Sequence, residues 1–173
     1  MFPLELAPAG GRIAIIGAGA GRQVQYARKS GQDFEQILAI EIEPAVIDAV
    51  RGSLADRFDH VYEDSRVQLV NREARSYMEG TDQRFDLIYL PSVGGYPQMM
   101  LEPGNMIRTI EAYKTLSEHL TERGVLAIWY PSVLDPRTIL TEQYMHTLEN
   151  PEIGLRVRSY RNGGEFLILA AKR

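Results

Sequence analysis

The run Gly17-Ala18-Gly19-Ala20-Gly21 contains only the two smallest residues and directly follows the apolar segment 12–16. Small side chains in a strand-to-helix turn let a ligand approach the backbone closely, and the N-terminus of the following helix then points toward that ligand. A dinucleotide fingerprint would place its third glycine at position 22, which is Arg22 here. The spacing therefore disfavours NAD and FAD, and for the glycines alone a tight turn without a ligand is an equal alternative.

Glu41 is the second residue that could do chemistry, because it ends an apolar segment about 20 residues after the glycine turn. A carboxylate at the carboxyl end of a buried parallel strand can accept hydrogen bonds from both ribose hydroxyls of an adenosine. The alternative is an exposed charge at the end of a strand. We predict that Glu41 binds a ribose, and we assign Ile42 to the same candidate site.

The segment Asn71-Arg72-Glu73-Ala74 follows the third apolar segment and should reach the same edge of the sheet. Taken alone, Glu73 is typical of a solvated turn residue. Beside the other two sites, we predict that Glu73 and Ala74 contact an adenine, through a side chain or the neighbouring backbone. Pro91, after the fourth apolar segment, completes the candidate cofactor site.

Five predicted strand–helix units position these residues. The predicted strands are 12–16, 37–42, 66–70, 85–90 and 125–130, and two further strands, 155–160 and 165–171, form a hairpin. Five helices are predicted. The first covers 22–30, the second starts at Pro44 and has core residues as far as Leu54, and the third covers 74–78. The fourth is long, is capped by Asn105 and includes Leu120, and the fifth has Asp135 as its N-cap and Pro136 at its first position.

This order predicts an α/β class: a Rossmann-like, doubly wound, mostly parallel seven-stranded sheet that ends in an antiparallel hairpin. We expect residues 1–173 to form a single domain, with 1–10 as a short lead-in and 155–171 as the terminal hairpin. The length suits one hydrophobic core.

Composition excludes several classes of site. The chain has no Cys, and its three His residues lack metal-binding spacing, so we expect no metal site. A net charge of −4 disfavours nucleic acid, and the closest basic cluster, Arg156, Arg158 and Arg161, is typical of a solvated strand. No apolar run spans a membrane and no signal peptide is evident, so a cytoplasmic location is expected.

Four motifs together resemble spermidine synthases, which belong to the class I S-adenosylmethionine-dependent methyltransferase superfamily. They are Ile15 to Gly21, Ala39 to Ile47, Asp64 to Arg75 and Phe85 to Tyr89. The resemblance implies S-adenosylmethionine, or its decarboxylated form, as the cofactor, with Gly17, Gly19, Gly21, Glu41 and Glu73 lining its site. Some similar domains are attached to membrane-spanning segments.

The resemblance does not carry over the catalytic carboxylates. Spermidine synthases hold an Asp where this chain has Ala20, and an Asp, a Ser and a second Asp where it has Pro91, Ser92 and Gly94. Aminopropyl transfer needs a carboxylate that orients the amine or accepts its proton, whereas methyl transfer from an activated sulfonium depends mainly on alignment.

We therefore expect methyl transfer to a small acceptor that is uncharged or weakly charged. The alternatives are a catalytically silent nucleoside-binding domain of a larger protein, and an aminopropyltransferase; an NAD-dependent dehydrogenase is disfavoured by Arg22. Ser92 and Tyr96 are weak catalytic candidates, and Met99, Met100 and Met106 are weak candidates for a pocket wall. A monomer or a dimer is expected.

Overall fold

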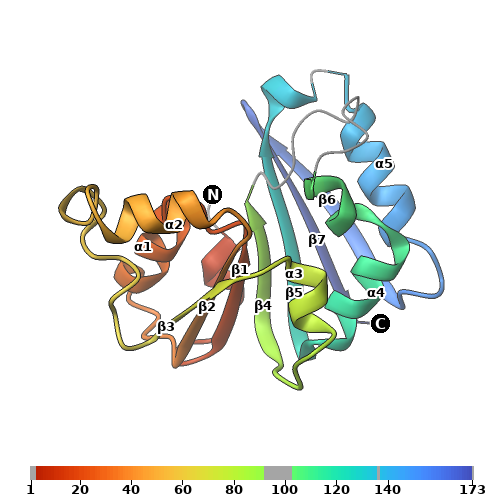
Figure 1. The fold of residues 1–173 in the computed structure, drawn as a ribbon. Helices are drawn as coiled ribbons and strands as arrows, with labels where there is room; N and C mark the ends of the chain where they lie inside the picture. The colour runs from red at the N-terminus through yellow and green to blue at the C-terminus, as the bar shows by residue number, and fades with distance from the viewer. Residues whose placement is uncertain (1–2, 92–102, 136, 173) are drawn as a thin grey trace.

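Short apolar segments that alternate with helices form one mixed sheet. The computed structural model describes residues 3–91, 103–135 and 137–172, and these contain seven strands in the order β3-β2-β1-β4-β5-β7-β6 (Figure 1). The strands are β1 (Arg12–Ile16), β2 (Gln36–Glu41), β3 (Val67–Asn71), β4 (Phe85–Pro91), β5 (Leu120–Pro131), β6 (Leu155–Asn162) and β7 (Glu165–Lys172). Strands β1 to β5 run parallel, and β7 pairs antiparallel with both β5 and β6. The predicted fold class is confirmed.

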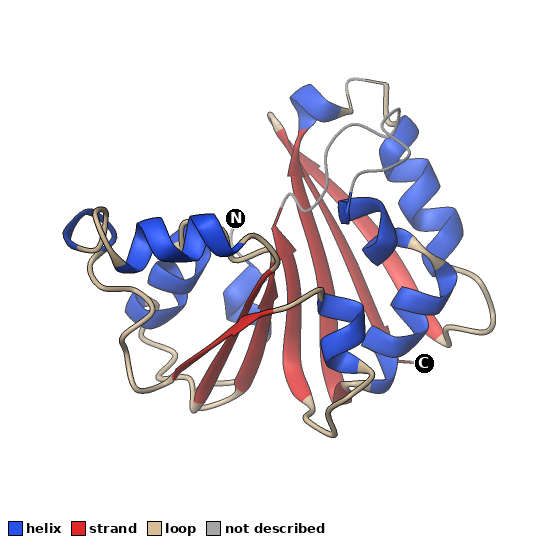
Figure 2. Ribbon diagram, viewed as in Figure 1, coloured by secondary structure: helices blue, strands red, loops and turns tan. Residues whose placement is uncertain are grey.

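Helices cover both faces of this sheet (Figure 2). The α-helices are α1 (Arg22–Lys29), α2 (Pro44–Arg51), α3 (Ala74–Met78), α4 (Ile110–Glu118) and α5 (Ile139–Leu148), and the 3₁₀ helices are η1 (Pro3–Leu6), η2 (Asp56–Phe58), η3 (Pro103–Arg108) and η4 (Ser132–Leu134). Alternate residues of β1 divide between two cores: Ile13 and Ile15 pack with η1, α1 and α2, whereas Ala14 and Ile16 pack with α3, α4 and α5. Burial on both faces explains why the central strands β1, β2 and β4 are mostly apolar.

The predicted long helix from Asn105 is wrong. A short 3₁₀ helix, η3, is followed by α4, whose N-cap is Thr109; the Thr109 hydroxyl accepts the N–H of Ala112 at 3.2 Å. Leu120 belongs to β5, where it pairs with Phe85. Gly124 also lies within β5, and a Cβ there would come to 2.7 Å from the Phe85 carbonyl oxygen, so close pairing with β4 favours glycine. Pairing with β4 therefore starts β5 earlier than its local pattern predicts.

The predicted start of α5 is also wrong. The helix begins at Ile139, after Thr138 with a φ of 64°, and not at position 136. Asp135 is 2% exposed, and its Oδ2 accepts hydrogen bonds from the N–H and the hydroxyl of Thr141, both at 2.8 Å. Asp135 thus accepts hydrogen bonds from the first turn of α5, although it lies farther from that turn in the sequence than an N-cap residue does. Pro136 lies outside the described residues.

Candidate functional site

The glycine turn joins β1 to α1 in a conformation that favours glycine. Gly17, Gly19 and Gly21 have φ values of 75°, 53° and 81°. The N–H groups of Gly17 and Ala18 both donate to the Ile40 carbonyl at 2.9 Å, so the turn is fixed to the end of β2. Gly21 is the N-cap of α1 and has no side chain to cap it. The first N–H groups of α1 therefore point out of the helix toward the turn, without intrahelical acceptors.

Glu41 lies at the end of β2 with its carboxylate oriented by two backbone donors. Its side chain is nearly buried, and the residue is 8% exposed. Oε2 accepts the Gly19 N–H at 2.7 Å, and Oε1 accepts the Glu43 N–H at 2.9 Å. Each carboxylate oxygen has a second lone pair, so both oxygens can accept one more hydrogen bond. Two adjacent ribose hydroxyls are donors that fit this arrangement.

Glu73 has a local structural role at the start of α3. Its carboxylate accepts the N–H groups of Arg75 at 2.8 Å and Ser76 at 2.7 Å, together with the Ser76 hydroxyl at 2.8 Å. Burial opposes the ionisation of Glu73, but the N–H groups of Ser76 and Arg75 outweigh it and lower the pKa of this carboxyl. Ala74 is the first helical residue, and its N–H has no acceptor within the helix. The backbone at Ala74 is therefore better placed to bind an adenine edge than the Glu73 carboxylate.

A small cavity of about 60 Å³ connects these elements. Its lining comes from the ends of β1 and β2, the start of α3 and the helix η3, and it includes Gly17, Ile42, Arg72, Glu73, Ala74 and Ile107. The structure thus brings Gly17, Ile42, Glu73 and Ala74 together, as the sequence predicted. Ile42 is 47% exposed, so its side chain is available to pack on a flat ring.

Tyr62 is a residue of this region that sequence reasoning missed. Its hydroxyl donates to the Gly19 carbonyl at 2.5 Å, and the residue is 7% exposed. Burial, together with the nearby Glu41 charge, raises the pKa of Tyr62 well above its usual range. The only local signal is the apolar pair Val61-Tyr62 within an otherwise polar segment. That pair predicts burial, but not contact with a turn more than 40 residues away.

The remaining candidates are placed only in part. Pro91 is the buried last residue of β4 and pairs with Trp129 of β5. Met106 is 56% exposed on η3, so its side chain does not form a buried pocket wall. Ser92, Gly94, Tyr96, Met99 and Met100 lie outside the described residues. Within the described part of the chain, no cluster of three or more His, Cys, Asp or Glu could hold a metal ion, and no helix is long and apolar enough to cross a membrane.

Comparison with known proteins decides the family. Residues 1–150 match the model of the spermine/spermidine synthase domain. The chain belongs to the spermine/spermidine synthase family. Its similarity to polyamine aminopropyltransferase 1 of Pseudomonas aeruginosa is 27% identity over 115 residues, which cover 66% of this chain and 38% of that protein. The polyamine aminopropyltransferase of Thermococcus onnurineus is 25% identical over 159 residues, which cover 89% of this chain and 56% of that protein. The chain thus spans less than two thirds of the length of these relatives.

Solved structures support the same fold. The spermidine synthase of Thermotoga maritima superposes with a TM-score of 0.71 at 20% identity, over 98% of this chain and 55% of that one. Human methyltransferase-like protein 13, solved in complex with SAH, also gives 0.71, at 16% identity, over 99% of this chain and 77% of that one. At these identities the likeness shows the fold alone, which is shared by aminopropyl- and methyltransferases.

This member of the spermine/spermidine synthase family has no carboxylate at two described positions where the family resemblance expects one. Ala20 is partly buried in the turn and Pro91 is buried at the end of β4. Neither residue can accept a proton or attract a cationic amine. The described part of the candidate site thus keeps the carboxylates of Glu41 and Glu73, whereas Ala20 and Pro91 are apolar.

Proposed function

We propose that this chain binds an adenosine-type sulfonium donor, S-adenosylmethionine or its decarboxylated form, and acts in aminopropyl transfer. Membership of the spermine/spermidine synthase family supports this proposal, as do relatives named polyamine aminopropyltransferases. The observation that carries it is the Glu41 carboxylate, which is oriented by the N–H groups of Gly19 and Glu43 and retains one acceptor position on each oxygen.

Described groups of the chain suit the ribose and the adenine of such a donor. The ribose hydroxyls donate to Glu41, and the adenine enters the cavity beside Ile42, where the Ala74 N–H can reach its ring. The sulfonium end lies along the glycine turn. Gly17 and Gly19 let the ligand approach the backbone there, because they have no side chains.

Aminopropyl transfer is a displacement at carbon. The lone pair of a neutral amine attacks the aminopropyl carbon bonded to the sulfonium sulfur, and the carbon–sulfur bond breaks as its electron pair goes to sulfur. Methylthioadenosine leaves, and the new secondary ammonium gives a proton to a base or to water. Ala20 and Pro91 supply neither this base nor an acidic surface for a polycation, so we expect slow transfer to polyamines.

Methyl transfer is the second candidate, and the same two residues favour it. The donor is already activated, and an in-line displacement at the methyl carbon needs alignment more than an acid–base pair. The apolar side chains of Ala20 and Pro91 suit an acceptor that is uncharged or weakly charged. A domain that binds the nucleoside without turnover is the third candidate.

Product analysis separates the three candidates. The chain is incubated with S-adenosylmethionine or its decarboxylated form, together with putrescine, spermidine or a metabolite extract, and the nucleoside products are measured by mass spectrometry. Protein-dependent methylthioadenosine from the decarboxylated donor supports aminopropyl transfer, and S-adenosylhomocysteine supports methyl transfer. Binding of either donor without product supports the silent domain. If neither donor binds, the proposal is wrong.

A further inference from the structure

Gly19 is held by hydrogen bonds on both of its peptide groups. Its N–H donates to Glu41 Oε2 at 2.7 Å, and its carbonyl oxygen accepts the Tyr62 hydroxyl at 2.5 Å. A Cβ at Gly19 would meet no atom within 4 Å, so no packing contact on that side fixes the residue. Backbone bonds of Gly17 and Ala18 fix the start of the turn to β2, and the orientation of Gly19 itself depends further on its own two hydrogen bonds, so the bond to Tyr62 acts on Glu41 through Gly19.

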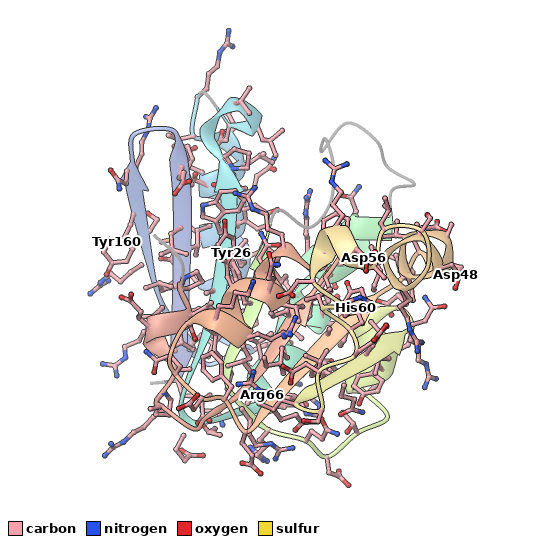
Figure 3. All side chains as sticks on the ribbon, turned by 90° about the vertical axis from the view of Figure 1, so that its left-hand side faces the viewer. Tyr26, Asp48, Asp56, His60, Arg66 and Tyr160 are labelled. Atoms are coloured by element: carbon pink, nitrogen blue, oxygen red, sulfur yellow. The ribbon has the colours of Figure 1, made fainter. Side chains whose placement is uncertain are left out.

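The segment 59–66, which carries Tyr62, is itself fixed to α1. Arg28 of α1 donates to Asp64 Oδ2 at 2.9 Å and to the Asp59 carbonyl oxygen at 3.0 Å. The Arg66 guanidinium donates to both oxygens of Asp64, with Nε 3.1 Å from Oδ1 and Nη2 3.0 Å from Oδ2. Figure 3 looks onto this face of the molecule, and His60 and Arg66, near the two ends of the segment, are labelled. The chain around Tyr62 is thus held in place by hydrogen bonds to α1, with the Tyr62 hydroxyl bonded to the glycine turn.

From this geometry we propose that Tyr62 is a positioning residue for the nucleoside site. The inference rests on the proposed function, because it concerns how Glu41 meets the ribose. The Tyr62 hydroxyl holds Gly19 so that the Gly19 N–H orients the Glu41 carboxylate before a ligand arrives. Preorganisation raises affinity because fewer groups must be ordered during binding.

Removal of the hydroxyl should affect the ribose and not the adenine. The adenine cavity is lined by α3, η3 and the ends of β1 and β2, and Tyr62 does not line it. A purely structural role would instead weaken every nucleoside equally, through a general loosening of the site. A pair of ligands that differ only in the ribose hydroxyls separates these two roles.

The experiment is isothermal titration calorimetry with 5′-methylthioadenosine and its 2′,3′-dideoxy analogue. The proteins are the parent, Tyr62→Phe, Glu41→Gln, and the matched control Tyr160→Phe, whose tyrosine is 54% exposed on β6. We expect Tyr62→Phe to weaken methylthioadenosine by roughly three- to tenfold, the range for one hydrogen bond, and to leave the analogue nearly unchanged. Tyr160→Phe should bind both ligands like the parent.

A second variant keeps the test decisive if Tyr62→Phe does not fold. Asp64→Asn weakens the hold of Arg28 on the segment without touching the Tyr62 ring, and should give a smaller loss that is again confined to methylthioadenosine. Equal losses for both ligands, or no loss in either variant, would overturn the role of Tyr62 while the effect of Glu41→Gln remained. If the parent binds neither ligand, or Glu41→Gln binds like the parent, the proposed function is overturned as well.

Discussion

Replacement of Gly21 by alanine would place a Cβ atom 2.4 Å from Val61 Cγ1. Real Cβ contacts are not this short, so either the turn or the segment that carries Val61 must move. Val61 is 1% exposed and packs in the core beneath α1, which leaves it little freedom to move away. In addition, the φ of Gly21 is 81°, which an L-residue with a side chain adopts only with strain.

Two contributions determine the expected loss of stability. A left-handed backbone costs an alanine about 1–2 kcal/mol. Excess volume in a well-packed core costs typically another 1–3 kcal/mol. Gly31 is the matched control, because its φ is 75° and a Cβ there would meet nothing within 4 Å. Gly31→Ala should therefore lose only the backbone contribution, about 1–2 kcal/mol, and Gly21→Ala about 2–5 kcal/mol in total.

Urea unfolding of the ligand-free proteins measures both free energies. The Val61→Ala background isolates the steric contribution, because the nearest remaining atom, Val61 Cβ, would lie 3.4 Å from the new Cβ, an ordinary contact. In that background, Gly21→Ala should cost about as much as Gly31→Ala, about 1–2 kcal/mol. If Gly21→Ala lowers the free energy of unfolding no more than Gly31→Ala does in the parent, Val61 does not clash with the new Cβ and the reasoning is refuted.

Two further predictions concern groups outside the glycine turn. Hydrogen bonds to Glu63 and, to a lesser degree, Asp56 raise the pKa of His60, so an NMR titration should give a pKa above 6.5. Glu63→Gln should lower the pKa of His60, and an unchanged pKa in this variant would contradict the role of Glu63. Because the pKa of His60 is raised in the folded protein, its protonation stabilises the fold at pH values below the pKa of the unfolded chain. This stabilisation is lost as the pH rises through the pKa of the folded protein. Thr141→Val removes a buried hydroxyl that donates to Asp135, and should lower the free energy of unfolding by about 1–3 kcal/mol in urea; a neutral result would show that Asp135 finds another donor.

The sequence predicted those parts of the fold that depend on local patterns. An apolar run that ends in a small-residue turn predicts a parallel strand followed by a helix, and β1 and α1 confirm it at the glycine turn. The position of Glu41 at the end of β2 follows from the same logic one unit later. The terminal hairpin follows from Arg161-Asn162-Gly163-Gly164 between two strand-like segments, although β6 extends to Asn162. Each of these predictions used residues close together in the chain.

One error and one omission lie where residues distant in the sequence decide the structure. β5 starts at Leu120 because Phe85, on another strand, pairs with it, and the local helical pattern through Leu120 contains no sign of this. Tyr62 meets Gly19 only after β2, α2 and η2 have turned the chain back toward α1. Glu73 caps its own helix, which is a local feature, but glutamate is not among the preferred N-cap residues, so an N-cap rule does not predict it.

Binding of 5′-methylthioadenosine to the parent and to Glu41→Gln tests the nucleoside site most directly. Glu122→Gln is the control, since that side chain is 91% exposed at the opposite end of the sheet. The parent and Glu122→Gln should bind with equal affinity. Glu41→Gln should bind roughly ten- to a hundredfold more weakly, because hydrogen bonds to a charged acceptor contribute about 1.5–3 kcal/mol. A parent that binds no adenosine nucleoside, or a Glu41→Gln variant that binds as tightly as the parent, would contradict the proposed site.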